Sequence, residues 1–137
     1  MKSVVVYWSG TGNTEEIANK ISADLGCDVF NVNATTPADV LENDLIIFGC
    51  PAMGAEELED SEFRPFYEEV MVNVGDKKVA LFGSYGWGDG QWMRDWVDRM
   101  SAAGANVITG EGLMANNEPD ADALAECESF GQTLAKA

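Results

Sequence analysis

The sequence predicts an α/β fold in which a doubly wound parallel sheet of five strands carries helices on both faces. Two observations predict it. Five short apolar runs rich in β-forming residues alternate along the chain with helical patterns. No linker, repeat or low-complexity segment interrupts this alternation, so residues 1–137 are expected to form one domain.

The first strand is predicted over residues 4–8, where "VVVYW" is a short apolar run typical of a buried strand. An apolar stripe at i, i+4 spacing follows and predicts a helix that begins near Asn13 or Thr14. The stripe consists of Ile17, Ala18, Ile21 and Leu25.

The second strand, over residues 27–32, has the weaker pattern of an edge strand. Thr36 and Pro37 then predict the start of a short helix, because Thr caps helices and Pro favours their first position. The third strand, over residues 44–49, is the most apolar of the five.

A helix is predicted over residues 61–74, with Ser61 as its cap and Pro65 close to its start. The fourth strand is predicted over 77–83 and the fifth over 105–115. Gly110 and Gly112 interrupt the fifth strand in the manner of a bulge. A further helix is marked by its apolar positions Met93, Trp96, Val97 and Met100, and Gly104 is expected to end it. One face of a C-terminal helix is marked by Leu124, Cys127, Gly131 and Leu134.

The chain is strongly acidic, with 24 Asp and Glu against 8 Lys and Arg, no His and a formal net charge of -16. Nucleic acid and anionic membranes are therefore poor partners, and a basic protein partner is favoured. The alternative is that the charge only keeps the protein soluble. The high charge also favours a monomer.

The three cysteines, Cys27, Cys50 and Cys127, are odd in number and form no C-x-x-C motif. This usage fits a reducing compartment and argues against disulfides and a zinc site. The N-terminal "MKSVVVYW" starts like a signal peptide, but its apolar run stops after Trp8. With no stretch near the roughly 20 apolar residues of a membrane span, a cytoplasmic protein is expected.

Ligands of an open parallel sheet bind beyond the carboxyl ends of its strands. The segments that follow the first, third, fourth and fifth strands are "SGTGNT", "CPAMGAEE", "SYGWGDGQW" and "NNEPD". Each is longer or richer in Gly and polar residues than a bare connection requires. These four segments are therefore the candidate binding loops.

Residues 9–14, "SGTGNT", join the first strand to the first helix and suit a phosphate, although they contain no Lys or Arg. Backbone N–H groups at a helix N-terminus satisfy phosphate oxygens, and glycines let the backbone close around them. The pattern is neither a P-loop nor G-x-G-x-x-G. The alternative is a tight turn capped by Thr11 or Asn13. The glycines are Gly10 and Gly12, and the polar donors are Ser9, Thr11, Asn13 and Thr14.

Met53 and Trp87 are large apolar side chains in two Gly-rich segments at the same end of the predicted sheet. A flat aromatic ligand could lie between them, because Trp stacks on aromatic rings and Met offers a polarisable sulfur. The alternative is that each is an ordinary core residue. Their glycine neighbours and their lack of a helical stripe favour the ligand.

"YWSGTGNT", "GCPAMGAEELEDSEF" and "LFGSYGWGDGQWM" together resemble the short-chain flavodoxins, and the resemblance extends over essentially all 137 residues. It implies the sheet order 2-1-3-4-5, non-covalently bound FMN, and a low-potential one-electron carrier between soluble redox enzymes. It also implies basic-surfaced reductases and low-potential oxidoreductases as partners.

The resemblance further implies a role for each matched position. Residues 9–14 would hold the FMN phosphate, helped by the Ser84 hydroxyl. Met53 would cover the inner flavin face and Trp87 the outer face. The remaining implied contacts are the turn Ala52, Met53 and Gly54 beside flavin N5, Glu56 at N3–H, the backbone around Gly88 and Asp89 at the pyrimidine end, and Asn117 beside the ribityl chain and ring. Tyr85 and Gly86 complete the implied FMN-binding residues.

The chain departs from the family pattern in three places. Pro51 stands where some relatives have a hydroxyl residue, and Ala55 replaces a residue that is often polar. We expect both to change FMN affinity rather than function. The segment 21–35 is also shorter than the pattern.

Electron transfer in this family suggests a task for Gly54, whose carbonyl could turn to accept the proton on N5 of the one-electron-reduced flavin. Glycine makes that turn cheap, because the turned peptide needs a residue with positive φ. The acidic surface, uncompensated by cations near the phosphate, would disfavour further negative charge on the flavin and lower its potential.

Two other functions are weighed against the carrier. An FMN-dependent quinone reductase would need a nicotinamide or quinone pocket, for which a short chain with Trp87 over the flavin leaves little room. A phospho-receiver would need an Asp ending the third strand and a Lys ending the fifth, and both are missing. No residue pattern indicates a catalytic acid, base or nucleophile, so no catalytic residue and no metal site are assigned.

Overall fold

The structure is a computed structural model that describes residues 3–8, 12–50, 62–74, 77–85, 91–102, 104, 106–107, 113–116 and 121–135. Its elements in chain order are β1 (Ser3–Tyr7), α1 (Asn13–Leu25), β2 (Asp28–Asn31), η1 (Val32–Ala34), α2 (Pro37–Val40), β3 (Leu45–Gly49), α3 (Phe63–Val72), β4 (Lys78–Tyr85), α4 (Gln91–Ala102), β5 (Asn106–Val107), β6 (Leu113–Asn116) and α5 (Ala121–Ala135).

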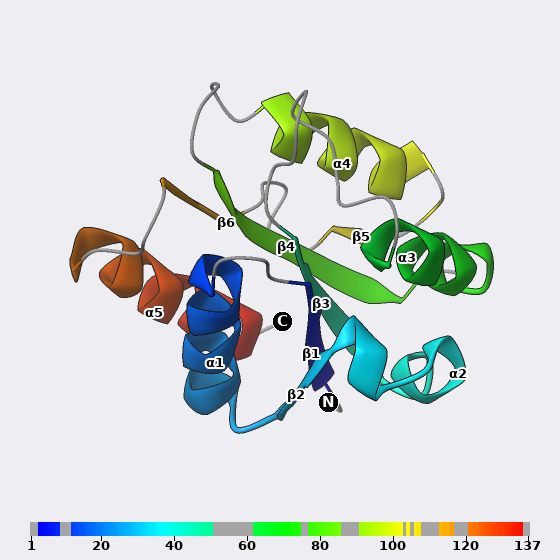
Figure 1. The fold of residues 1–137 in the computed structure, drawn as a ribbon, viewed down its shortest axis with the longest axis horizontal. Helices are drawn as coiled ribbons and strands as arrows, with labels where there is room; N and C mark the ends of the chain where they lie inside the picture. The colour runs from blue at the N-terminus through cyan, green and yellow to red at the C-terminus, as the bar shows by residue number, and fades with distance from the viewer. Residues whose placement is uncertain are drawn as a thin grey trace.

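The strands pair in parallel in the order β2-β1-β3-β4-β5, and β6 also pairs with β4 (Figure 1). This confirms the predicted parallel sheet and its order 2-1-3-4-5. The predicted fifth strand is divided: β5 pairs with the first residues of β4, and β6 pairs with its last four. The residues between them, including Gly110 and Gly112, lie outside the described ranges.

Alternate residues of each strand enter two separate cores, because successive side chains of a strand point to opposite faces. On β3, Ile46 and Phe48 pack with α3 and α4, whereas Leu45 and Ile47 pack with α1 and α5. Figure 1 shows these helix pairs on opposite sides of the sheet. A strand covered on both faces must be apolar throughout, which explains why residues 44–49 are the most apolar run.

The first two helices, α1 and α2, begin where the sequence predicts, at Asn13 and Pro37. The apolar stripe of α1 is buried at Ile17, Ala18 and Ile21, and the helix ends at Gly26, whose φ of 65° is left-handed. Thr36 caps α2 by accepting a hydrogen bond from the Asp39 N–H at 3.2 Å. The short turn η1 between β2 and α2 was not predicted.

Two predicted boundaries are wrong. α3 begins at Phe63 with Glu62 at its N-cap and no side-chain cap, so Ser61, which lies outside the described residues, is not the N-cap residue. β4 continues through Ser84 and Tyr85, which were expected in the following loop, because β6 pairs with them. The end of α4 is as predicted, with Gly104 in the left-handed region at φ 93°.

α5 packs closely on α1, since a Cβ on Gly131 would lie 3.0 Å from the Cβ of Asp24. Cys127 on the same helix is 1% exposed. Burial, and then the negative charges of Asp24 and Glu126, raise the pKa of the Cys127 thiol to about 11. The thiol is therefore a small neutral core group at physiological pH.

None of the helices in the described part of the chain is both long and apolar enough to cross a membrane. Cys27, Cys50 and Cys127 are all free thiols.

We expect the Cys127 thiol to make the fold sensitive to alkaline pH. The folded protein holds this proton more tightly than the unfolded chain, whose thiol pKa has the ordinary value of 9.0. Stability from this group is therefore complete below pH 9 and is lost as pH rises toward 11, by up to about 1.4 kcal/mol per pH unit.

The measurement is the urea unfolding free energy of the wild-type protein and of Cys127→Ala across that pH range. The variant loses the packing of the sulfur atom at every pH, but its stability should fall less steeply as pH rises. Identical slopes for the two proteins would contradict this account.

Candidate functional site

The register of β1, β3 and β4 brings the carboxyl ends of three strands to one edge of the sheet. Tyr7 lies opposite Gly49, and Gly49 lies opposite Phe82. The pairing continues one residue further, because the Trp8 N–H donates to the Gly49 carbonyl at 3.0 Å and the Cys50 N–H donates to the Phe82 carbonyl at 3.2 Å. Residues that follow these strands in the sequence therefore start from the same edge.

The first turn of α1 is the best-described part of this edge. Gly12 occupies the N-cap with φ 94° and ψ -9°, a left-handed conformation that a residue with Cβ rarely adopts. Its carbonyl accepts the Glu16 N–H at 3.0 Å, and Gly12 has no side chain of its own with which to cap the helix. Thr14, which follows one residue into the helix, is 1% exposed. A helix start with glycine at the N-cap and a buried Thr in its first turn suits an anion, because N–H groups and the helix dipole converge there.

The electrostatics of this helix start are acidic. Glu15 and Glu16 lie in the first turn of α1, and the first cation of the helix, Lys20, pairs with Asp24 at 3.3 Å. The pKa of the Tyr7 phenol is raised, first by burial and then by the negative charge of Glu15. An anion at this position would therefore have to be bound by neutral hydrogen-bond donors.

Two glycines allow close packing at this edge. A Cβ on Gly49 would overlap the buried ring of Phe82 on the neighbouring strand. A Cβ on Gly83 would overlap the Cys50 carbonyl and lie 3.2 Å from the Trp92 ring. The absence of side chains at both positions lets β3, β4 and the start of α4 approach one another.

A long-range hydrogen bond ties two sides of the edge together. The Trp8 indole N–H, at the end of β1, donates to the Glu62 carboxylate, at the start of α3, at 3.2 Å. These two residues enclose in sequence both the "SGTGNT" and the "CPAMGAEE" segments. Sequence reasoning missed the pair. The only signal was an indole N–H at a strand end, which needs an acceptor but does not identify it.

The structure describes five of the predicted site residues. Gly12, Asn13 and Thr14 form the start of α1. Ser84 and Tyr85 end β4, opposite Ala115 and Asn116. α1 packs against β4, so these two groups belong to neighbouring elements. The predicted site residues outside the described ranges are Ser9, Gly10, Thr11, Ala52, Met53, Gly54, Glu56, Gly86, Trp87, Gly88, Asp89 and Asn117, as are Pro51 and Ala55.

Among the described residues, no three His, Cys, Asp or Glu side chains come close enough together to hold a metal ion.

Comparison with known proteins gives a consistent result. A sequence profile of the family described as Flavodoxin matches residues 5–131. The flavodoxin of Clostridium beijerinckii is 49% identical, over 96% of this chain and 97% of that protein. The flavodoxin of Megasphaera elsdenii is also 49% identical, over 97% of this chain and 98% of that protein.

The fold comparison agrees. The solution structure of two-electron reduced Megasphaera elsdenii flavodoxin superposes with a TM-score of 0.85 at 44% identity, over 98% of this chain and 99% of that one.

The tight approach at Gly83 yields a test of this edge. Gly83→Ala should lower the unfolding free energy of the FMN-free protein by about 1–3 kcal/mol, because the new methyl group meets backbone atoms that cannot rotate away. Gly131→Ala is the matched control: its methyl group meets the Asp24 side chain, and Ala gains about 1 kcal/mol of helix propensity over Gly. Urea unfolding measures both. Equal effects of the two substitutions would contradict the proposed packing.

Proposed function

The chain belongs to the flavodoxin family and is an FMN-binding electron carrier, and we propose that the FMN phosphate binds at the start of its helix α1. The observation that carries the proposal is the left-handed Gly12 at the N-cap of α1, a residue that has no side chain with which to cap the helix. A phosphate can take the place of that cap, accepting backbone N–H groups and gaining from the helix dipole.

The described residues fit a phosphate group. Thr14 supplies a buried hydroxyl in the first turn, and the helix has no basic residue near its start. Hydrogen bonds from neutral donors to a charged acceptor are strong enough to hold a phosphate, at about 1.5–3 kcal/mol each. We propose that residues 9–14 surround the phosphate and that the Ser84 hydroxyl, at the end of β4, adds a further donor.

The remaining contacts are proposed on family membership. Met53 and Trp87 would cover the two faces of the flavin, and the peptide at Gly54 would lie beside N5. Ala52, Glu56, Tyr85, Gly86, Gly88, Asp89 and Asn117 complete the proposed site.

Bound FMN supplies one-electron redox chemistry, and the protein supplies its position and its electric field. We propose that the carrier has a low potential, because a chain of net charge -16 disfavours additional negative charge on the flavin. The acidic first turn of α1, with Glu15 and Glu16, supports this proposal, since these carboxylates lie close to the proposed phosphate position.

The proposed function also includes the redox partners and the cellular location of the protein. The acidic surface would attract basic-surfaced reductases and low-potential oxidoreductases toward the flavin. We propose that residues 1–137 act as a single FMN-binding domain and as a monomer in the cytoplasm, without substrate turnover of its own. Steady oxidation of NAD(P)H by the purified protein alone would instead indicate the quinone reductase.

The phosphate assignment can be tested at Thr14. Thr14→Val keeps the buried shape but removes the hydroxyl, so FMN affinity should fall about tenfold. Riboflavin, which has the ring but no phosphate, should bind both proteins equally. Fluorescence titration of the FMN-free proteins measures both affinities. A parallel loss of riboflavin affinity would mean that Thr14 supports the fold rather than the phosphate.

The partner assignment can be tested by salt. Electron-transfer rates to a basic redox protein should fall as ionic strength rises, by roughly tenfold or more between low and physiological salt. Rates to a small neutral acceptor, such as a quinone, should change little. Stopped-flow measurements on the reduced protein give both rates, and a salt-independent rate with the basic partner would contradict the proposal.

A further inference from the structure

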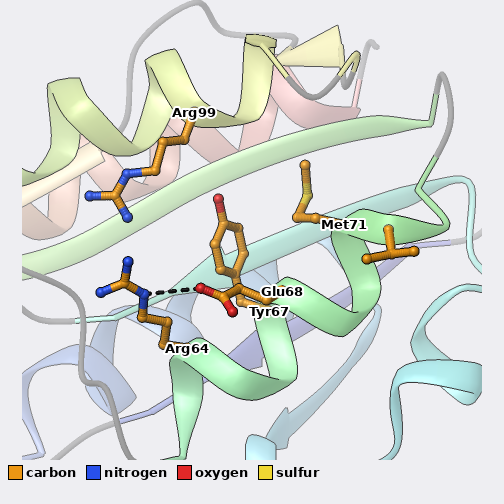
Figure 2. A pocket seen from close by; sticks show the side chains of 6 residues that line it. Arg64, Tyr67, Glu68, Met71 and Arg99 are labelled. Carbon is orange, nitrogen blue, oxygen red and sulfur yellow. Dashed lines mark hydrogen bonds and ion pairs between the residues drawn. The ribbon is translucent and has the colours of Figure 1, made fainter.

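A pocket of about 300 Å³ lies between α3 and α4, on the face of the sheet away from α1. Figure 2 shows that its wall combines two arginines, a tyrosine hydroxyl, a carboxylate and a thioether. The residues that line it are Arg64, Tyr67, Glu68, Met71, Val72 and Arg99. Nothing in the proposed electron-carrier function uses these side chains.

Arg99 is one of the two cations that line the pocket. It is an exposed residue of α4, and no carboxylate among the described residues forms an ion pair with it. Its guanidinium group offers five N–H donors in a planar arrangement that matches a carboxylate. In a chain with only 8 basic residues, such a group at a pocket wall is unusual.

Arg64, across the pocket on α3, is only partly used. Its Nε donates to the Glu68 carboxylate at 3.0 Å, one turn further along the helix. This contact leaves the terminal amino groups of Arg64 available. Figure 2 shows that the two guanidinium groups turn toward the same side of the pocket.

Tyr67 supplies a neutral donor between the two cations. Its ring is buried against Phe63, Phe48 and Trp96, so its position is fixed. Burial raises the pKa of Tyr67 and the charge of Glu68 adds to this rise, whereas the charges of Arg99 and Arg64, which line the same pocket, act in the opposite direction. The hydroxyl therefore stays protonated at physiological pH and can donate a hydrogen bond.

The charges and the apolar wall together select a class of ligand. Two arginines and one glutamate give the pocket one net positive charge, while the whole chain carries -16. A monoanion is matched by that charge, whereas a second negative charge on the ligand would have no cationic partner left among the lining residues. Met71 and Val72, the latter 81% exposed, offer apolar surface beside the cations.

We propose that this pocket binds a small monocarboxylate with an apolar body. The carboxylate would lie between Arg99 and Arg64 and accept a hydrogen bond from the Tyr67 hydroxyl. The apolar body of the ligand would cover Met71 and Val72. A volume of about 300 Å³ accepts a molecule of this size. The proposal is independent of the FMN site, because no lining residue belongs to that site.

Phenylacetate is a suitable probe, since it joins one carboxylate to a ring that can contact the Met71 sulfur. It would be added to the FMN-loaded, isotope-labelled protein at constant ionic strength and followed by NMR. We expect saturable shifts confined to α3 and α4, with a Kd of roughly a millimolar, as befits an exposed site. Phenylacetamide, the neutral analogue, should produce no such shifts.

Two variants that each remove one positive charge distinguish binding in the pocket from an effect of the protein's overall charge. Arg99→Gln should raise the Kd about fivefold or more, whereas Lys20→Gln, on α1 at the other face, should leave it unchanged. Neither residue lies in the proposed FMN contacts. The proposal is overturned if phenylacetate gives no saturable shift, if phenylacetamide binds equally well, or if both variants weaken binding to the same extent.

Discussion

The parallel register of β1, β3 and β4 is the constraint on which the other features depend. It determines which residues of each strand enter which core: a slip of one residue on β1 would exchange Val5 for Val6 between the two faces. The same register sets the carboxyl ends of three strands side by side. Gly83 permits the close approach that this arrangement requires, and the Trp8–Glu62 hydrogen bond connects the two sides of the resulting edge. The functional site is thus a consequence of the way in which the sheet is packed.

The two candidate anion sites differ in the charge of their surroundings. The anion binding that we propose at the start of α1 would rely on backbone geometry and hydroxyls, because the nearby charges, Glu15 and Glu16, are negative. A phosphate-binding lysine would make binding easier, but it would also offset the negative field around the flavin. The pocket between α3 and α4 is the opposite case, since Arg64 and Arg99 create a local positive charge on an acidic protein. The two proposed sites would thus bind their anions in different ways, with neutral donors at the start of α1 and guanidinium groups between α3 and α4.

Sequence reasoning succeeded where local pattern and burial agree. β3 was predictable because both of its faces are covered, and α2 because Thr36 and Pro37 act locally. Sequence reasoning failed where contacts between residues far apart in the chain determine the structure. β4 extends to Tyr85 only because β6 pairs with it, α3 begins without a side-chain cap, and the Trp8–Glu62 contact joins residues 54 positions apart. Of the site, the phosphate loop followed from general chemistry, whereas the flavin contacts depended on resemblance to a family, because stacking partners from separate loops have no sequence spacing of their own.

The central claim is that this chain binds FMN through a cation-free helix start and carries electrons one at a time. The most direct test is a visible spectrum of the FMN-loaded protein during stepwise anaerobic reduction with dithionite. Two separate steps, with a distinct long-wavelength absorbing species that accumulates between them and disappears before the end, are the predicted result. Bleaching in a single two-electron step would contradict the account, and a protein that stays colourless after FMN is added would show that the start of α1 does not bind the flavin phosphate.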